Sequence, residues 1–170
     1  IELFKTSQQR ISIGMAYPIV KRIIAGLRHD TRIKDIQAAG SLRRMKETVG
    51  DIDILVSGAA GADIVGSFVR MPGVTQVLAA GDTKGSVRVQ EGVQVDVRVV
   101  REDEFGSALQ YFTGSKEHNV HLREIAKKKG FKVSEYGIFQ GNKKVGGRFE
   151  EEIYKILGMD WIPPELRENR

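Results

Sequence analysis

Three acidic residues within two apolar segments carry the most specific chemistry of this sequence. Asp51 and Asp53 flank an isoleucine, and Asp96 follows about forty residues later between two valines. Residues i and i+2 of a strand project from the same face, so Asp51 and Asp53 are expected side by side. Adjacent carboxylates repel each other, and such a pair is tolerable when it holds hard divalent cations. With Asp96 from a neighbouring strand, the pattern predicts a pocket for two Mg²⁺ ions.

A glycine and a serine before these acids suggest a phosphate site. Gly40 lets the backbone turn closely after a predicted strand, and Ser41 is expected to cap a short helix through Arg44. Free N–H groups at a helix start favour phosphate, and Arg44, or failing that Arg43, could bind triphosphate oxygens. Gly50 would let a substrate approach. A Gly-Ser pair alone is usually a turn and an Asp-x-Asp alone a solvated strand end, but together with Asp96 they indicate nucleotidyl transfer.

Amino-acid composition excludes several kinds of functional site. The chain has 170 residues, a net charge of +5, a pI near 9.5 and no cysteine, which excludes disulfides, thiolate zinc sites and a cysteine nucleophile. The basic balance favours a polyanionic partner. With no apolar run of membrane-spanning length and no visible signal peptide, the chain is expected to be soluble and cytoplasmic, without a membrane partner. Because it begins at Ile1 rather than Met, it is expected to be part of a longer protein.

Hydrophobic periodicity predicts an α+β fold in two parts. The first part is expected to be a mixed, mostly antiparallel sheet with helices on one face, and the second mainly helical with a small hairpin. The predicted helices are 12–27, 41–44, 62–71, 104–112, 115–129 and 149–157. The predicted strands are 33–39, 51–56, 74–80, 86–90 and 93–100, with a hairpin region over 131–145.

The second part is rich in lysine and arginine. A charge run is usually a solvated face, but beside a triphosphate site it favours a nucleic-acid track. The residues chosen for this track are Arg123, Lys127, Lys128 and Lys129, with Lys84 and Arg88 in the first part as further DNA contacts. His118 and His121 are three apart on one predicted helix, but a third ligand is not evident, so a metal pair is not favoured.

Several of these residues form longer motifs that resemble the palm and thumb of a family X DNA polymerase. The motifs are Gly40-Ser41-Leu42-Arg43-Arg44, Gly50-Asp51-Ile52-Asp53, Val95-Asp96-Val97-Arg98, Tyr111-Phe112-Thr113-Gly114-Ser115, Asn119, Arg123 and Glu135-Tyr136-Gly137. The sequence from Trp161 to Arg167 is similar to the prokaryotic branch. The resemblance implies a remnant of a preceding domain at 1–10, a palm at 11–102, a thumb at 103–160, and a linker from 161–170 to a C-terminal phosphoesterase domain. N-terminal DNA-binding regions would also lie outside the chain.

The resemblance also implies a role for each residue. Asp51, Asp53 and Asp96 would be catalytic and bind two Mg²⁺ ions, with Mn²⁺ as a possible substitute. Binding of the deoxynucleoside triphosphate would fall to Gly40, Ser41, Arg44, Gly50, Tyr111, Phe112, Gly114 and Asn119. Within this set Tyr111, Phe112 and Gly114 would line the sugar pocket, Asn119 would meet the base edge, and Arg123 would face the template. A cis peptide bond is expected between Gly114 and Ser115.

Two departures from the family pattern concern charge. Gln94 stands where an arginine is common, so support for Asp96 could come from Arg98 instead, although Arg98 could equally be a structural ion pair. Lys116 replaces a common acid. The expected function is gap-filling DNA synthesis in repair, by a monomer acting on a DNA primer-template. The alternatives are a template-independent nucleotidyltransferase and a DNA-binding module with vestigial catalysis.

Overall fold

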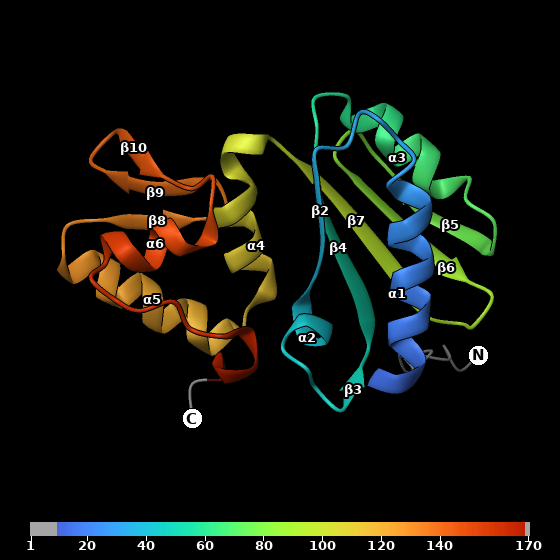
Figure 1. Cartoon of the computed structure of the whole chain (residues 1–170), viewed down its shortest axis with the longest axis horizontal. Helices are drawn as coiled ribbons and strands as arrows, with labels where there is room; N and C mark the ends of the chain where they lie inside the picture. Colours follow the sequence, from blue (N-terminus) through green and yellow to red (C-terminus); the bar gives the residue numbers. More distant parts are fainter. Residues whose placement is uncertain (1–9, 169–170) are drawn as a thin grey trace, which may run out of the picture.

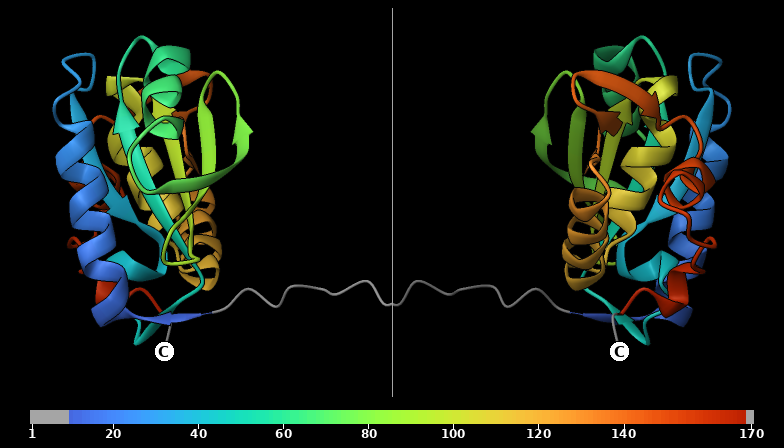
Figure 2. Two further views of the ribbon diagram at one scale, coloured as in Figure 1. Left: turned by 90° about the vertical axis from the view of Figure 1, so that its right-hand side faces the viewer. Right: turned by 90° about the vertical axis from the view of Figure 1, so that its left-hand side faces the viewer.

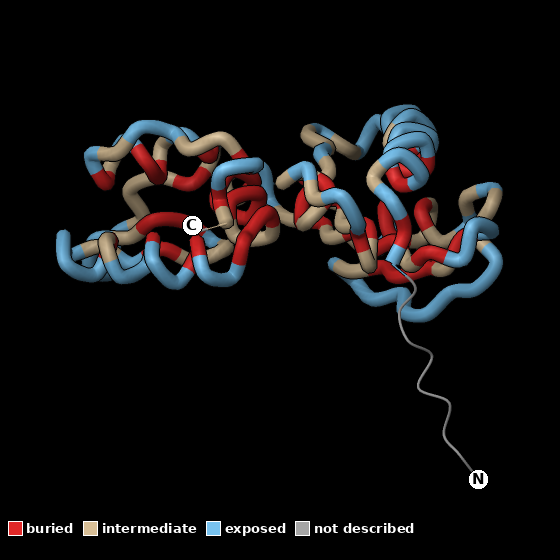
Figure 3. Tube along the Cα trace, turned by 90° about the horizontal axis from the view of Figure 1, so that it is seen from below, coloured by how far each residue is buried: buried red, intermediate tan, exposed pale blue. Residues whose placement is uncertain are grey.

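The chain folds into two lobes that are joined by one helix. The computed structural model describes residues 10–168. Figure 1 shows a sheet covered by helices on the right and a smaller lobe on the left, with α4 (Phe105–Thr113) between them. Viewed from below, each lobe has buried residues of its own, and the connection between the lobes is narrow (Figure 3).

The larger lobe is built on a five-stranded mixed sheet. Its strands lie in the order β2 (Asp35–Ala39), β4 (Asp51–Ser57), β7 (Gln94–Val100), β6 (Lys84–Val89) and β5 (Val74–Ala80). Strands β4 and β7 run parallel, and the other neighbouring pairs are antiparallel. The predicted mixed, mostly antiparallel sheet is confirmed. A separate pair, β1 (Ile11–Ser12) and β3 (Thr48–Val49), ties the first described residues to the start of β4.

Alternating side chains divide this sheet into an apolar and a polar face. Ile52, Ile54 and Val95 are buried against α1 (Ile13–Leu27) and α3 (Gly61–Val69). The predicted helix over 12–27 is present as α1, which begins at Ile13, and Ser12 caps it because its side chain accepts a hydrogen bond from the Met15 backbone N–H. In the side views α1 runs roughly along the strands that it covers (Figure 2). The opposite face carries the acidic residues and is covered in part by α4, which packs on Leu55.

Several element boundaries in this lobe differ from the prediction, and those of α2 and β6 lie nearest the acidic residues. The short helix α2 spans Gly40–Arg43 and follows Ala39, so Ser41 lies inside it and is not its cap. The positive φ of Gly40, +64°, turns the chain directly from β2 into the helix, one residue earlier than expected. Strand β6 begins at Lys84 instead of Ser86, because pairing with β7 continues to the edge of the sheet.

The smaller lobe packs three helices against a small antiparallel sheet. After a 3-10 turn, η1 (Glu102–Glu104), come α4, α5 (Lys116–Lys128) and α6 (Glu150–Ile156). Leu122, Ile138 and Tyr154 are fully or almost fully buried in its core. The predicted hairpin is a three-stranded sheet, because a third strand pairs with the second; the strands are β8 (Lys132–Ser134), β9 (Gly137–Gln140) and β10 (Lys143–Gly146).

The segment predicted to open a linker is packed against the smaller lobe as far as it is described. It contains a short turn, η2 (Pro164–Leu166), followed by the fully buried Arg167. Two hydrogen bonds from Arg167 reach the carboxylate of Glu150 at 2.9 and 2.8 Å. A buried guanidinium needs such a partner, so residues 161–168 belong with the smaller lobe. The predicted domain remnant at 1–10 lies outside the described residues except for Arg10. Within residues 10–168 no helix is long and apolar enough to cross a membrane.

Candidate active site

The strand register brings the three predicted acids to one place on the polar face. Asp53 and Asp96 are direct partners in the parallel pairing of β4 with β7. Asp51 lies two residues before Asp53 and therefore points to the same face. The other neighbour of Asp53 is Ala39, the last residue before α2. The predicted Gly-Ser turn and the predicted acids thus meet at one end of the sheet.

Asp53 lies where its negative charge is unfavourable. Burial raises the pKa of its carboxyl, and the negative charges of Asp96 and Asp51 raise it further, to about 6. The positive charges of Arg98 and Lys84 offset part of this effect. The site therefore combines close carboxylates with a surplus of negative charge that a cation would neutralise.

The three acids fit a divalent metal in two respects: carboxylates are suitable donors, and the strand register makes them neighbours. Carboxylate oxygens are the ligands that Mg²⁺ prefers. Within residues 10–168, however, no three acidic or histidine side chains converge on one point as they stand. The carboxylate of Asp96 turns toward Gln94, whose Nε2 donates a hydrogen bond to its Oδ1 at 3.1 Å. Gln94 thus holds Asp96 through a hydrogen bond from an uncharged side chain. For the three acids to share metal ions, their carboxylates would have to rotate toward one another.

The glycine of the turn is required by its contact with the acids. A Cβ atom at Gly40 would lie 2.6 Å from Oδ2 of Asp53, and the φ of Gly40 is +64°. A side chain at this position would therefore both strain the backbone and displace the carboxylate. Gly40 keeps the first turn of α2 directly beside Asp53.

The two arginines of α2 have different surroundings. Arg43 is almost buried, and its guanidinium donates to Glu150 at 2.7 and 3.1 Å and to the Thr113 hydroxyl at 2.8 Å. It therefore ties the two lobes together. Arg44 donates from Nη1 to the Thr113 carbonyl at 2.6 Å and from Nε to Glu168 at 2.8 Å. Both arginines contact Thr113, and Arg44 also lies beside Gly114 of the predicted sugar pocket, since a Cβ at Gly114 would lie 3.1 Å from its Nη1.

Sequence reasoning missed one cation near the phosphate side of the site. Arg10 donates from Nε and Nη2 to the hydroxyl and carbonyl of Thr48, at 2.9 and 2.8 Å. A Cβ atom at Gly50 would lie 3.4 Å from its Nη1. Only the β1–β3 pairing brings Arg10 to this place, so its distance in sequence from Gly50 gave no signal.

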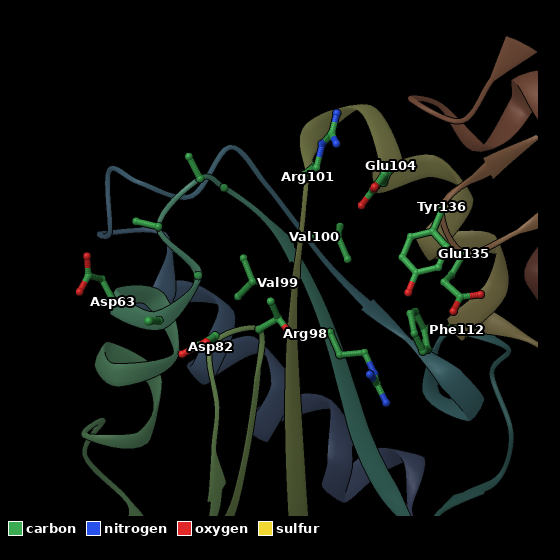
Figure 4. A pocket seen from close by; sticks show the side chains of 16 residues that line it. Asp63, Asp82, Arg98, Val99, Val100, Arg101, Glu104, Phe112, Glu135 and Tyr136 are labelled. Carbon is green, nitrogen blue, oxygen red and sulfur yellow. The ribbon is translucent and has the colours of Figure 1, made fainter. Parts of the chain in front are cut away.

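The aromatic part of the predicted sugar pocket borders the cleft between the lobes. Phe112 lies under the guanidinium of Arg98, with 4.5 Å between the Arg98 Cζ and the ring centroid. Its ring makes an edge contact with Tyr111, with centroids 5.0 Å apart. Arg98, Phe112 and Tyr136 line a cleft of about 710 Å³. Figure 4 shows the Arg98 side chain extending toward Phe112, with Tyr136 on the same side as Phe112. Arg98 is therefore shared between the acids and this cleft. The expected cis peptide bond between Gly114 and Ser115 is present.

Asn119 lies close to this motif but uses its amide internally. Its Oδ1 accepts a hydrogen bond from Gln110 at 2.7 Å, and its Nδ2 donates to the Tyr111 carbonyl at 2.8 Å. The side chain thus fixes the end of α4 against α5. Contact of Asn119 with a base edge stays a prediction.

The predicted DNA-binding cations divide into exposed and engaged residues. Arg123, Lys127 and Lys128 lie on the exposed side of α5. Lys129 is exposed as well, but its Nζ donates a hydrogen bond to the Leu157 carbonyl at the end of α6. Lys129 therefore has a structural contact within the lobe, and its contact with DNA stays a prediction. Arg88 donates to the Gly92 carbonyl at 3.1 Å, and Lys84 lies opposite Arg98 on the polar face.

The two histidines of α5 differ in burial, since His118 is buried and His121 is exposed. His118 is buried and its Nε2 lies 2.9 Å from the Tyr154 hydroxyl. Burial lowers the pKa of His118, and the charge of Arg167 lowers it further, to about 4. His118 is therefore a neutral core residue at neutral pH.

Comparison with known proteins gives consistent matches. The DNA polymerase beta thumb model matches residues 108–168. The chain is 39% identical over 165 residues to the DNA polymerase/3'-5' exonuclease PolX of Bacillus subtilis (strain 168), covering 95% of this chain and 29% of that protein. It is 32% identical over 161 residues to DNA polymerase lambda of Rattus norvegicus, covering 77% of this chain and 28% of that protein.

A third relative is comparable in length to the chain. Repair DNA polymerase X of African swine fever virus (isolate Pig/Kenya/KEN-50/1950) is 29% identical over 142 residues, which cover 79% of this chain and 82% of that protein. The chain thus spans less than a third of the bacterial and rat relatives and most of the viral one. The thumb match falls on the smaller lobe, from within α4 to Glu168. From these matches and the two-lobed α+β fold, the chain belongs to family X of the DNA polymerases.

Proposed function

We propose that this chain carries out template-directed deoxynucleotidyl transfer, in which a primer 3′-hydroxyl attacks the α-phosphate of a deoxynucleoside triphosphate and pyrophosphate leaves. One observation carries the proposal. Asp53 and Asp96 are direct neighbours in the β4–β7 pairing, with Asp51 on the same face. Close carboxylates in a partly buried site repel each other unless a cation neutralises them. Such groups are concentrated at functional sites. Membership of family X supports nucleotidyl transfer as the function of this site.

Each residue of the site has a part in the proposal. Asp51, Asp53 and Asp96 would hold two Mg²⁺ ions, which supply charge neutralisation at the transferring phosphate. Gly40 keeps the α2 backbone close to these acids, and Ser41 and Arg44 would orient the triphosphate. Arg10, held beside Gly50 by Thr48, would add a second cation on that side.

The proposed partners follow from the motif residues around Phe112 and from the exposed cations of α5. Phe112 and Tyr111 offer an apolar wall for the sugar, and Gly114 leaves room beside Arg44. The exposed cations Arg123, Lys127 and Lys128 would contact the phosphates of a primer-template. A gapped duplex is the proposed substrate, in keeping with a repair role, and the protein is proposed to act as a monomer in a bacterial cytoplasm.

Primer extension by Asp96→Asn tests the assignment of the acids. The substitution keeps the side-chain shape and removes one charge, so extension on gapped DNA with Mg²⁺ should fall about 10³-fold or more. The matched control is Asp160→Asn, because Asp160 is exposed and lies in the smaller lobe, away from the acids. The control should retain the wild-type rate.

The choice of substrate separates the alternatives. Addition to a gapped or recessed primer, but not to single-stranded primer, would support the templated reaction. Equal addition to a single-stranded primer would replace it by template-independent transfer. Undiminished extension by Asp96→Asn would contradict the site itself, and DNA binding without any extension by the wild type under Mg²⁺ or Mn²⁺ would favour vestigial catalysis.

A further inference from the structure

A carboxylate from the end of the smaller lobe lies on the arginine that is proposed to bind triphosphate. Oε1 of Glu168 accepts a hydrogen bond from Nε of Arg44 at 2.8 Å and lies 3.8 Å from Nζ of Lys46. The side chains of Arg44 and Glu168 are only 15% and 21% exposed. An anionic group thus already occupies a partly desolvated position between two cations.

Arg44 also donates a hydrogen bond to the Thr113 carbonyl, so this contact and the contact with Glu168 together reduce the N–H groups left for phosphate. A guanidinium binds phosphate through two adjacent N–H groups, either Nε with Nη2 or Nη1 with Nη2. Glu168 takes Nε, while the Thr113 carbonyl takes Nη1 at 2.6 Å. Nε has a single N–H, so the Nε–Nη2 edge is engaged by Glu168, while the Thr113 carbonyl takes one of the two N–H groups of Nη1. A phosphate that binds the Nε–Nη2 edge has to displace the Glu168 carboxylate.

The two acceptors differ in how easily they can leave. Thr113 contributes a backbone carbonyl at the end of α4, next to Gly114, and its own side chain is fully buried. Glu168 contributes a side chain, and the residue before it stays anchored because the Arg167 carbonyl accepts a hydrogen bond from the Ser115 backbone at 3.0 Å. Rotation of the Glu168 side chain alone would clear Nε of Arg44.

Space for an incoming anion exists at the same place. A cleft of about 650 Å³ lies between the α2–β3 segment and the η2 turn. Arg44, Lys46 and Thr48 line one side, and Glu165, Leu166 and Glu168 line the other. A phosphate group entering here meets Arg44 and Lys46 only after the Glu168 carboxylate moves aside.

We infer that Glu168 is an intramolecular competitor for the triphosphate, which occupies Arg44 until a nucleotide displaces it. The inference rests on the proposed role of Arg44. Displacement links nucleotide binding to the end of the smaller lobe, since the released Glu168 no longer joins this segment to α2. Nucleotide affinity is lowered by the competition, and Glu168 is held against Arg44 only while Arg44 is without phosphate.

Titration calorimetry with magnesium tripolyphosphate tests the competition without a base or a sugar. The variants are Glu168→Gln and, as a control, Glu165→Gln, which removes the same charge from an exposed residue of the same cleft. Removing a partly buried competitor should tighten binding about 3- to 10-fold. Glu165→Gln removes an exposed charge that salt screens, so its affinity for tripolyphosphate should stay within about 2-fold of the wild-type value.

Arg44→Ala, alone and combined with Glu168→Gln, completes the test. Binding that weakens with Arg44→Ala, and an effect of Glu168→Gln that vanishes in the double variant, support the inference. If tripolyphosphate binding is detectable only for the Glu168→Gln variant, this result also supports the inference. Equal affinities of Glu168→Gln and Glu165→Gln overturn it, even where Arg44→Ala still weakens binding and the proposed site stands. Unchanged binding in Arg44→Ala, or no binding by any variant, overturns both the inference and the assignment of the triphosphate to Arg44.

Discussion

Two carboxyls of this molecule have pKa values that their neighbours shift in opposite directions. Asp53 has like charges as neighbours, and its pKa is raised to about 6. Burial also opposes ionisation of Glu150, but hydrogen bonds from Arg167 and Arg43 outweigh it and lower the pKa of Glu150 to about 2. A buried carboxylate is therefore costly in the candidate site and stabilising at the junction of the lobes, and the two carboxyls predict opposite effects of pH on stability.

Asp53 should make the protein less stable as pH rises from about 4 to 6 when divalent metal is removed. Its native pKa lies above the unfolded value, so the native state binds more protons in this range, and ionisation costs about 3 kcal/mol above it. Asp53→Asn should lack this loss and be more stable than the wild type at pH 7. Urea unfolding in EDTA at several pH values measures the difference, and parallel curves for the two proteins would contradict it.

Glu150 should have the reverse effect at lower pH. Its native pKa lies below the unfolded value, so its contribution is fully present above about pH 4.5 and is lost toward pH 2. Glu150→Gln leaves Arg167 buried without its counter-ion, which should cost about 3 to 5 kcal/mol at pH 7.

The neighbouring Glu151→Gln is the matched control for Glu150→Gln, because Glu151 is exposed. It should change the free energy of unfolding by less than about 0.5 kcal/mol. Similar losses in both variants, measured by urea unfolding, would indicate a general charge effect on α6 and not a buried ion-pair cluster.

At the scale of elements, α4 is the part that both lobes share. Its side chains Phe105, Ala108 and Leu109 pack on Leu55 of the sheet, while its backbone lies against the start of α6. A Cβ atom at Gly106 would lie 2.2 Å from the carbonyl carbon of Phe149. The two helices can therefore approach this closely only because residue 106 is glycine.

Gly106→Ala should destabilise the protein by about 2 kcal/mol or more, because backbone atoms of α6 cannot move aside as a flexible side chain would. Gly14→Ala in α1 is the control, since its Cβ would be no closer than 3.9 Å to the Ser12 hydroxyl. This change should stabilise by about 0.5 to 1 kcal/mol. Thermal unfolding distinguishes the two, and equal effects would show that the α4–α6 contact tolerates a methyl group.

At the scale of the whole molecule, charged contacts join the lobes on both sides of α4. Arg43 pairs with Glu150, Arg44 with Glu168, and Arg148 with Asp35 at 3.3 Å. These contacts use cations that a sequence count would assign to DNA. The count of 27 lysines and arginines therefore overstates the cations available for a nucleic-acid surface, although such pairs leave the net charge of +5 unchanged.

DNA binding should accordingly depend on Lys127 and Lys128 but not on Lys129. If both exposed lysines contact phosphates, replacing them by glutamine should reduce the slope of log K against log salt by up to about 2, at roughly 0.9 per duplex phosphate. Lys129→Gln should leave the slope unchanged and lower the melting temperature, because it removes the contact to the Leu157 carbonyl. Anisotropy of a labelled primer-template at several salt concentrations decides this, and a flatter slope for Lys129→Gln would return that residue to the DNA surface.

The sequence alone determined the acidic site and most of the elements. Alternation around Asp51, Asp53 and Asp96 predicted three acids on the polar face, and the parallel register confirms that they are neighbours. Periodicity found α1 and strand β5 because these patterns are local. Motif residues around Gly114 and Asn119 indicated the family, which the matches over the chain confirm.

Tertiary structure decided which charged residues are available for chemistry. Nothing local in the sequence distinguishes Arg43 from Arg44, or Lys129 from Lys128, because their partners lie 28 to 124 residues away. Arg10 reaches Gly50 only through a strand pairing, and Arg167 is buried only because Glu150 is there to meet it. Burial and ion pairing depend on contacts between distant segments, so local patterns could predict the acids but not the cations that surround them.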